Sequence, residues 1–176
     1  MVNMIPDPEV LAAAGDIIDL CRRNGDRLAT AESCTGGLIA GCLTAIDGSS
    51  MVVDGGFITY SNEAKMAMLG VSGDLLALHG AVSKPVACAM AEGALRHSPL
   101  ATLSVAVTGI AGPGGGSAEK PVGLVHFACA GGNRPTLHQS HIFKGDRHQV
   151  RRQTVLAAFD LIREMIEQYP APQPAP

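Results

Sequence analysis

The sequence predicts a single α/β domain in which helices are layered against a mixed β-sheet. The chain has 176 residues, which suits one domain with enough length to bury a core. Short apolar runs typical of strands alternate with segments of helical periodicity along most of the chain. Two strand-like runs near the C-terminus are separated only by a short Gly- and Pro-containing turn. This spacing predicts an antiparallel hairpin, which makes the sheet mixed.

The first half of the chain is expected to alternate helix and strand. Apolar residues recur at helical spacing before Asn24-Gly25, which is a plausible helix C-cap. Ser61 or Asn62 is a candidate N-cap for a later helix. The expected elements are a helix at 10–23, a strand at 27–31, a helix at 38–46, a strand at 57–60 and a helix ending at 69.

The second half continues the pattern and closes with a long helix. Ser83 is a candidate cap for the next helix, and Pro85 is tolerated in a first helical turn. The expected elements are a helix at 85–96, strands at 103–107, 122–130 and 136–143, and a helix at 146–168. We expect residues 1–169 to form the domain. Residues 170–176 read PAPQPAP, which predicts a Pro-rich disordered or extended tail.

The composition excludes several classes of protein. Hydrophobic residues make up 47% of the chain and charged residues 16%, so the bulk of the chain is not intrinsically disordered. The net charge of -3 and the lack of a Lys/Arg run argue against a nucleic-acid partner. No apolar stretch approaches the roughly 18 residues of a membrane span. We therefore expect a cytoplasmic protein with no membrane partner.

The cysteine and histidine patterns indicate neither a disulfide framework nor a metal site. The five cysteines are widely spaced and form no CxxC pair. His138 and His141 are three residues apart on an expected strand and so face opposite sides of the sheet. We expect reduced cysteines, no bound metal and no cofactor.

The first of three polar, glycine-flanked segments is Ala31–Gly37, which lies between an expected strand and an expected helix. A hydroxyl at such a point lies near unpaired backbone N–H groups and the positive end of a helix dipole, where an oxyanion is stabilised. Ser33 and Thr35 are the candidate hydroxyls, and Cys34 is a rival nucleophile in the same turn. The alternative is that Ser33 or Thr35 merely caps the helix.

The second segment, Thr59–Lys65, combines Tyr60, Ser61 and a lysine one helical turn after Ser61. A lysine that is desolvated in a cleft can act as a general base for a serine. Tyr60 would then share or relay the proton. Alternatively, Ser61 is a helix cap, Lys65 is a solvated charge and Tyr60 packs at the sheet edge. Spacing alone does not decide whether Lys65 serves Ser33 or Ser61.

The third segment follows a buried strand and is rich in glycine, from Thr108 to Ser117. Such a loop presents consecutive N–H groups that can bind a phosphate or carboxylate, although it could also be a mobile turn. It lacks the Lys-Ser/Thr ending of a P-loop. Arg147, at the start of the last helix, could bind an anion bidentately or be an exposed charge. With 21 glycines, no Trp and two Tyr, we expect ligand recognition by backbone N–H groups and a few charges.

Taken together, these segments resemble a known family. The chain carries TAESCTGG at 30–37, GFITYSNEAK at 56–65, GAVS at 80–83, VTGIAGP at 107–113 and GDR at 145–147, in that order. The set is similar to the CinA C-terminal domain family, the nicotinamide-nucleotide amidohydrolases, over roughly residues 8–168. The resemblance implies a three-layer α/β/α sandwich. It also implies hydrolysis of nicotinamide mononucleotide to nicotinic acid mononucleotide and ammonia.

The resemblance also assigns residues. It implies that Ser33 is the nucleophile, Lys65 the general base and Tyr60 an assisting residue, without a metal or cofactor. We expect N–H groups around Cys34 to Gly36 to hold the oxyanion. The expected substrate-binding residues are Thr35, Gly36, Gly37, Thr108, Gly109, Gly112, Gly115 and Arg147.

The sequence departs from the family pattern at Met51–Gly55, where family members often carry an aromatic residue and an arginine. We expect this departure to affect local packing or an oligomer contact. The partner is expected to be nicotinamide mononucleotide, and the protein a homodimer or higher homo-oligomer. The competing hypotheses are a non-catalytic nucleotide- or anion-binding module, a Ser-Lys amidase of other specificity and a structural interaction protein.

Overall fold

The computed structural model describes residues 7–171 and forms one five-stranded sheet between helices. The strand order is β2-β1-β3-β4-β5. The strands are β1 Leu28–Glu32, β2 Val53–Ile58, β3 Leu103–Gly109, β4 Leu124–Gly131 and β5 Arg134–Ile142. The helices are α1 Pro8–Asn24, α2 Leu38–Thr44, α3 Asn62–Leu69, α4 Gly73–His79, α5 Lys84–Arg96 and α6 Arg147–Gln168, with a 3-10 turn at Ser49–Met51.

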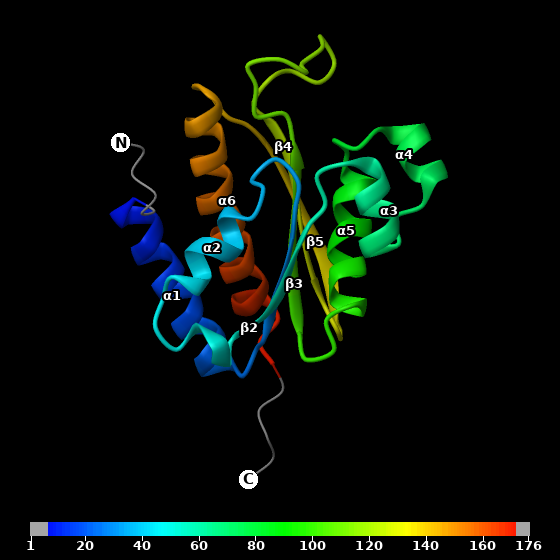
Figure 1. Cartoon of the computed structure of the whole chain (residues 1–176). Coiled ribbons are helices and arrows are strands. Elements are labelled where there is room, and N and C mark those ends of the chain that lie inside the picture. The colour runs from blue at the N-terminus through cyan, green and yellow to red at the C-terminus, as the bar shows by residue number, and fades with distance from the viewer. Residues whose placement is uncertain (1–6, 172–176) are drawn as a thin grey trace.

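The helices cover the two faces of the sheet in separate layers (Figure 1). One core lies under α1, α2 and α6 and receives alternate side chains of the sheet such as Val105 and Phe127. The other lies under α3, α4 and α5 and receives the intervening residues, such as Ala106 and Ala128. The alternation follows from the two-residue period of a strand, and it confirms the predicted three-layer α/β/α sandwich.

Most of the predicted elements are confirmed to within two residues at each end. The predicted strand at 57–60 is misplaced, since β2 spans Val53–Ile58 and Tyr60 lies beyond it. Gly55 and Gly56 have low strand propensity, but a Cβ at Gly56 would stand 2.7 Å from Thr30 Oγ1 of the neighbouring strand. The close packing of the Thr30 side chain against β2 therefore requires a glycine at position 56.

The helix α4 was not predicted. Ser72 caps α4 through Leu75 N, and the helix buries only Leu76, so its apolar period is weak. Residues 172–176 of the predicted tail lie outside the described residues. Across residues 7–171, no helix is long and apolar enough to cross a membrane. All five cysteines are free.

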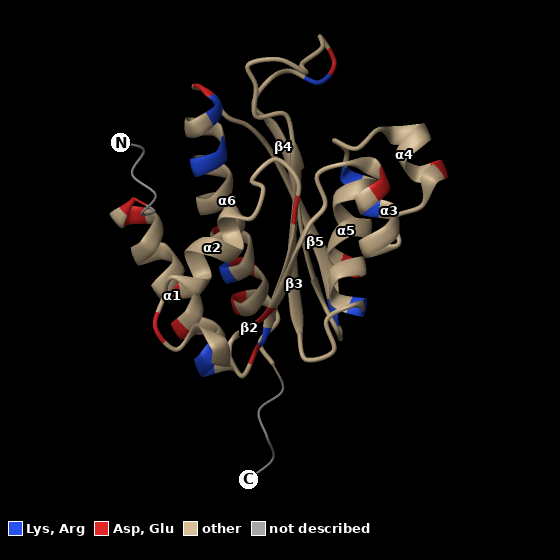
Figure 2. Cartoon of the chain, viewed as in Figure 1, with Lys and Arg blue, Asp and Glu red and all other residues tan. Residues whose placement is uncertain are grey.

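The sheet brings the ends of its three parallel strands together. β1 pairs in parallel with both β2 and β3, so Glu32, Ile58 and Gly109 end at one edge. The antiparallel hairpin of β4 and β5 extends the sheet beyond β3, as predicted. Figure 2 shows basic residues on the first turns of α6, near the same edge. The polar segments that follow the three parallel strands are therefore neighbours.

The opposite end of β1 is held by a buried ion pair. Asp26 is 2% exposed, and its two carboxylate oxygens accept hydrogen bonds from Arg134 Nη1 and Nη2, each at 3.1 Å. Its carboxylate also accepts a hydrogen bond from the Thr102 hydroxyl at 2.6 Å. One carboxylate thus links the starts of β1, β3 and β5.

Replacing Asp26 with asparagine should destabilise the fold by about 3 kcal/mol, because the Arg134 guanidinium loses its buried counter-charge. Urea unfolding of the variant and the unmutated protein measures this difference. Arg96→Lys, at an exposed residue in the last turn of α5, is a control that should leave the midpoint unchanged. An unchanged midpoint in Asp26→Asn would show that the pair contributes nothing to stability.

Candidate active site

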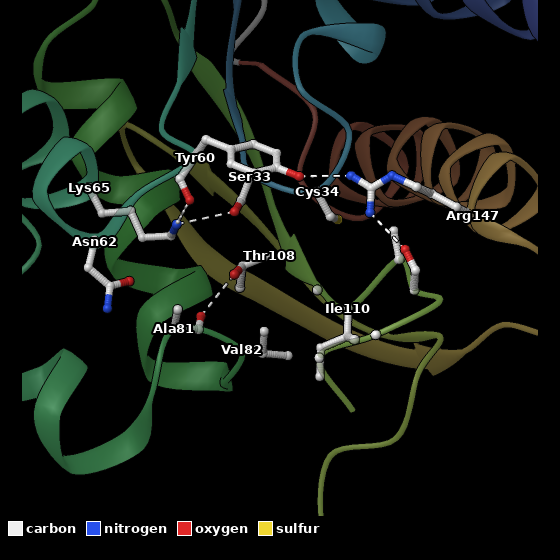
Figure 3. Close-up of a pocket in the computed structure, with 15 residues that line it drawn as sticks. Ser33, Cys34, Tyr60, Asn62, Lys65, Ala81, Val82, Thr108, Ile110 and Arg147 are labelled. Carbon is white, nitrogen blue, oxygen red and sulfur yellow. Dashed lines mark hydrogen bonds between the residues drawn. The ribbon is translucent and has the colours of Figure 1, made fainter. Parts of the chain in front are cut away.

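A pocket with a cavity volume of about 280 Å³ opens at the edge where β1, β2 and β3 end (Figure 3). The turn after β1, the β2–α3 connection, the segment before α5, the glycine-rich loop after β3 and the first residue of α6 all contribute to its walls. The lining residues are Ser33, Cys34, Tyr60, Asn62, Lys65, Ala81, Val82, Thr108, Gly109, Ile110, Ala111, Gly112, Gly114, Gly115 and Arg147.

Ser33 and Lys65 meet at the base of this pocket. The Lys65 Nζ lies 3.1 Å from Ser33 Oγ, and the side chain of Lys65 is 1% exposed. The amine also donates to the backbone carbonyls of Thr59 at 2.8 Å and Tyr60 at 3.5 Å. A neutral amine has two N–H donors and one lone pair, so both carbonyls can be satisfied while the lone pair accepts the Ser33 hydroxyl proton. The contacts therefore suit a lysine acting as a base.

The fold separates the two serines between which spacing could not decide. Ser61 is the N-cap of α3, and its hydroxyl accepts a hydrogen bond from Ala64 N at 3.0 Å. Lys65, one turn further along α3, extends instead to Ser33. Ser61 therefore caps the helix, and Ser33 is the serine that contacts the amine.

Burial lowers the pKa of the Lys65 amine and raises that of the Cys34 thiol. Desolvation lowers the pKa of Lys65 from that of a free lysine, which increases the neutral fraction of the amine. Burial raises the pKa of the Cys34 thiol to about 11. Because Cys34 is then a neutral thiol near pH 7, it is a poor rival to Ser33 as nucleophile.

Three of the expected substrate-binding residues lie outside the pocket lining. Thr35 is fully buried, and its hydroxyl donates to Glu32 Oε2 at 2.6 Å. The N–H of Gly37 donates to the same carboxylate oxygen at 2.9 Å, and that of Gly36 donates to Ser33 O at 3.1 Å. Within the described residues, the N–H groups of Cys34 and Thr35 have no acceptor. Of these two residues, only Cys34 lines the pocket.

Tyr60 and Arg147 meet across the pocket mouth. Arg147 donates to the Tyr60 hydroxyl at 2.8 Å and to the carbonyl of Gly112 at 2.9 Å (Figure 3). The Tyr60 side chain is 59% exposed. Its backbone carbonyl contacts Lys65, whereas its hydroxyl is placed against Arg147.

Thr108 and the glycine-rich loop also line the pocket. The buried Thr108 hydroxyl donates to the carbonyl of Ala81 at 2.9 Å, which ties the segment before α5 to the end of β3. Gly109, Gly112 and Gly115 all line the pocket. Gly112 has a φ of 84°, a backbone conformation that favours glycine. At its glycines the loop thus brings backbone to the cavity, and Ile110 and Ala111 line it as well.

Sequence reasoning missed several residues that shape the pocket. Asn62, Ala81 and Val82 line it, although the sequence suggested only a helix cap for Asn62 and gave Ala81 and Val82 no role beyond the family motif. Glu32 was not singled out, yet its buried carboxylate organises the turn that carries Ser33. A charged residue at the end of a fully buried strand was the available signal. Within residues 7–171, no group of three or more His, Cys, Asp or Glu side chains could hold a metal ion.

Comparison with known proteins relates this chain to the CinA C-terminal domain and to proteins that contain it. The sequence profile described as "CinA C-terminal domain" matches residues 11–166. "Nicotinamide-nucleotide amidohydrolase PncC" of Escherichia coli (strain K12) is 46% identical over 156 residues, which cover 89% of this chain and 94% of that protein. A "CinA-like protein" of Anaeromyxobacter sp. (strain K) is 52% identical over 139 residues, 79% of this chain. The match covers only 34% of that protein, so the chain corresponds to about a third of such relatives.

Solved structures share the fold. The crystal structure of the competence/damage inducible protein CihA from Agrobacterium tumefaciens matches with a TM-score of 0.88 and 49% identity, covering 92% of this chain and 98% of that chain. A CinA superfamily protein from Klebsiella pneumoniae 700603 matches with a TM-score of 0.87 and 34% identity, covering 91% and 99%.

Proposed function

This chain belongs to the CinA C-terminal domain family, and from that premise we propose that it hydrolyses nicotinamide mononucleotide to nicotinic acid mononucleotide and ammonia. The observation that carries the proposal is the 3.1 Å contact between Ser33 Oγ and the buried amine of Lys65 in the pocket. The similarity to PncC, of which the chain covers 94%, supports the choice of substrate. A Ser-Lys amidase of other specificity is the outcome that a negative assay with this substrate would favour.

In the acylation step, Ser33 Oγ attacks the carboxamide carbon while Lys65 Nζ takes the hydroxyl proton. The N–H of Cys34, the residue after the nucleophile, is the donor best placed to stabilise the oxyanion. Lys65 then delivers its proton to the amide nitrogen, and the C–N bond breaks to release ammonia. Ser33 is left as an ester of the nicotinic acid nucleotide.

In the deacylation step, water attacks the ester carbon and Lys65 takes a proton from that water. The acyl bond to Ser33 Oγ breaks, and the serine recovers its proton from Lys65. The direct Ser33–Lys65 contact supports proton transfer without a relay. The Tyr60 hydroxyl, which contacts Arg147, serves the substrate side of the pocket in this scheme.

The phosphate of the substrate would be bound by Arg147 and by backbone N–H groups of the glycine-rich loop. Arg147 lines the pocket at the first position of α6, and its two bonded nitrogens already contact Tyr60 and Gly112. No acidic side chain lines this pocket within the described residues, so no negative charge there repels a bound anion.

Replacing Arg147 with lysine should raise KM for nicotinamide mononucleotide about 10- to 100-fold with a smaller effect on kcat, because a single ammonium cannot reproduce the guanidinium contacts. Steady-state ammonia release over a range of substrate concentrations measures both constants. Arg96→Lys should leave both unchanged. An unaltered KM in Arg147→Lys would place the phosphate elsewhere.

A substrate series tests the proposed specificity. Ammonia release is compared for nicotinamide mononucleotide, for the riboside that lacks the phosphate, and for free nicotinamide. We expect kcat/KM to fall in that order. Equal rates for all three would indicate an amidase that does not recognise the nucleotide. A homodimeric or larger assembly and a cytoplasmic location stay predictions, the first open to light scattering of the purified protein.

A further inference from the structure

We propose that Glu32 is a positioning residue whose buried carboxylate holds the Ser33 turn in its reactive geometry. The inference rests on the proposed function, because it concerns the same nucleophile. Glu32 is 1% exposed and does not line the pocket. It therefore cannot touch the substrate, and any effect on the reaction must pass through the residues it contacts.

The carboxylate of Glu32 accepts four hydrogen bonds. Its Oε2 accepts from the Thr35 hydroxyl at 2.6 Å, from Gly37 N at 2.9 Å and from Ile39 N at 3.1 Å. Its Oε1 accepts from Ala40 N at 2.8 Å. Three of the four donors are backbone N–H groups around the start of α2, which no helical carbonyl can satisfy.

The identity of the α2 N-cap explains why these donors need Glu32. The N-cap residue is Gly37, which has no side chain to accept a hydrogen bond. A carboxylate five residues upstream, at the end of β1, performs that role instead. One side chain consequently joins the strand end to the helix start, and Ser33 lies in the turn between them.

The backbone of Glu32 connects to the other member of the catalytic pair. Its carbonyl accepts a hydrogen bond from Thr59 N at 2.8 Å, and the Thr59 carbonyl accepts from Lys65 Nζ at 2.8 Å. Glu32 thus contacts the Ser33 turn through its side chain, and through its main chain it contacts Thr59, the residue whose carbonyl binds the Lys65 amine. Loosening this residue would change the relative placement of nucleophile and base.

The capping contact also determines which N–H groups remain for the oxyanion. Glu32 accepts the N–H groups of Gly37, Ile39 and Ala40, whereas those of Cys34 and Thr35 have no acceptor within the described residues. The turn that Glu32 fixes is the one that carries the Cys34 donor. Positioning by Glu32 therefore affects transition-state stabilisation as well as nucleophile geometry.

The test compares Glu32→Gln with Asp26→Asn, a matched change at the other end of β1. Both replace a buried carboxylate with its amide, but only Glu32 contacts the Ser33 turn. Ammonia release is measured at a temperature where circular dichroism shows both variants to be folded. We expect Glu32→Gln to lower kcat about 10- to 100-fold with KM unchanged, and Asp26→Asn to keep kcat. An unchanged kcat in Glu32→Gln, or an equal fall in both variants, would overturn the proposal.

Thr35→Val is the second variant, and it tests the positioning role of Glu32 if Glu32→Gln does not fold. It removes one donor to Glu32 while preserving side-chain shape in a buried position. Positioning predicts a lower kcat at unchanged KM. A raised KM with unchanged kcat would instead make Thr35 a substrate-binding residue and overturn the inference.

A reactivity assay separates this inference from the proposed substrate. The rate at which a fluorophosphonate modifies Ser33, followed by intact mass, is compared for the same variants. If the unmutated protein releases no ammonia from nicotinamide mononucleotide, the substrate assignment fails while the modification rates still test Glu32. We expect slower modification in Glu32→Gln than in Asp26→Asn; equal rates would overturn the positioning role.

Discussion

Replacing Ser33 with alanine should lower kcat for ammonia release by roughly 10⁴- to 10⁶-fold, which is the range expected when a nucleophile that forms a covalent intermediate is removed. Ser33 Oγ is the hydroxyl in contact with the Lys65 amine, and no other serine is hydrogen-bonded to it among the described residues. In the proposed mechanism, loss of this oxygen removes the atom that bonds to the carboxamide carbon. Steady-state assays with purified protein measure the loss.

Ser72→Ala and Ser61→Ala are the controls for this substitution. Each residue caps a helix, α4 and α3 respectively, and each alanine variant should cost about 1 kcal/mol of stability. Both should retain activity, because neither hydroxyl contacts Lys65. Activity that survives in Ser33→Ala but is lost in Ser61→Ala would identify Ser61 as the nucleophile and contradict the assignment of Ser33.

Replacing Lys65 with methionine should lower kcat by about 10²- to 10⁴-fold, the contribution expected of a general base. Methionine fills a similar buried volume but has no lone pair able to take the Ser33 proton. Lys84→Met, at an exposed residue that begins α5, is the matched control and should keep full activity. Equal rates in Lys65→Met and the unmutated protein would exclude Lys65 as the base.

The pH dependence of the reaction provides a second test of Lys65. Burial lowers the pKa of this amine, so the neutral form becomes populated at a lower pH than it does for a free lysine. Because the neutral amine is the base in the proposed mechanism, kcat/KM should rise with pH and level off above the folded-state pKa of Lys65. This ascending limb should vanish in Lys65→Met. A limb that persists there would belong to another group.

The sequence was sufficient for the layered fold because its elements are strongly patterned. Apolar runs such as Leu103–Val107 become buried strands, and the Gly-containing turn between β4 and β5 forms the predicted hairpin. The errors fall where tertiary contacts override local preference. Gly55 and Gly56 lie within β2, and α4 buries a single residue, so neither has a pattern that local reasoning can detect.

The candidate site was predictable in its chemistry and less so in its supporting contacts. Ser33, Lys65 and Arg147, which the motifs single out, all line one pocket, whereas the carboxylate of Glu32 was not anticipated. Its role depends on the three-dimensional meeting of a strand end with an uncapped helix start. Spacing identifies residues that can react, but it does not show which buried polar group holds them.

The high glycine content has a broader origin than ligand binding. A Cβ at Gly109 would stand 2.8 Å from the carbonyl of Leu124, and one at Gly123 would stand 2.0 Å from the carbonyl of Phe143. These glycines allow backbone to approach backbone. The glycine content therefore reflects close backbone packing as well as the approach of a ligand. Gly109 serves both purposes, because it also lines the pocket.

The most direct test of the account is the incubation of purified protein with nicotinamide mononucleotide, with ammonia and nicotinic acid mononucleotide both quantified. Hydrolysis by Ser33 predicts that the two products form in equal amounts with the unmutated protein and that both are lost in Ser33→Ala. Absence of ammonia from the unmutated protein would contradict the proposed function. Undiminished release by Ser33→Ala would contradict the proposed mechanism.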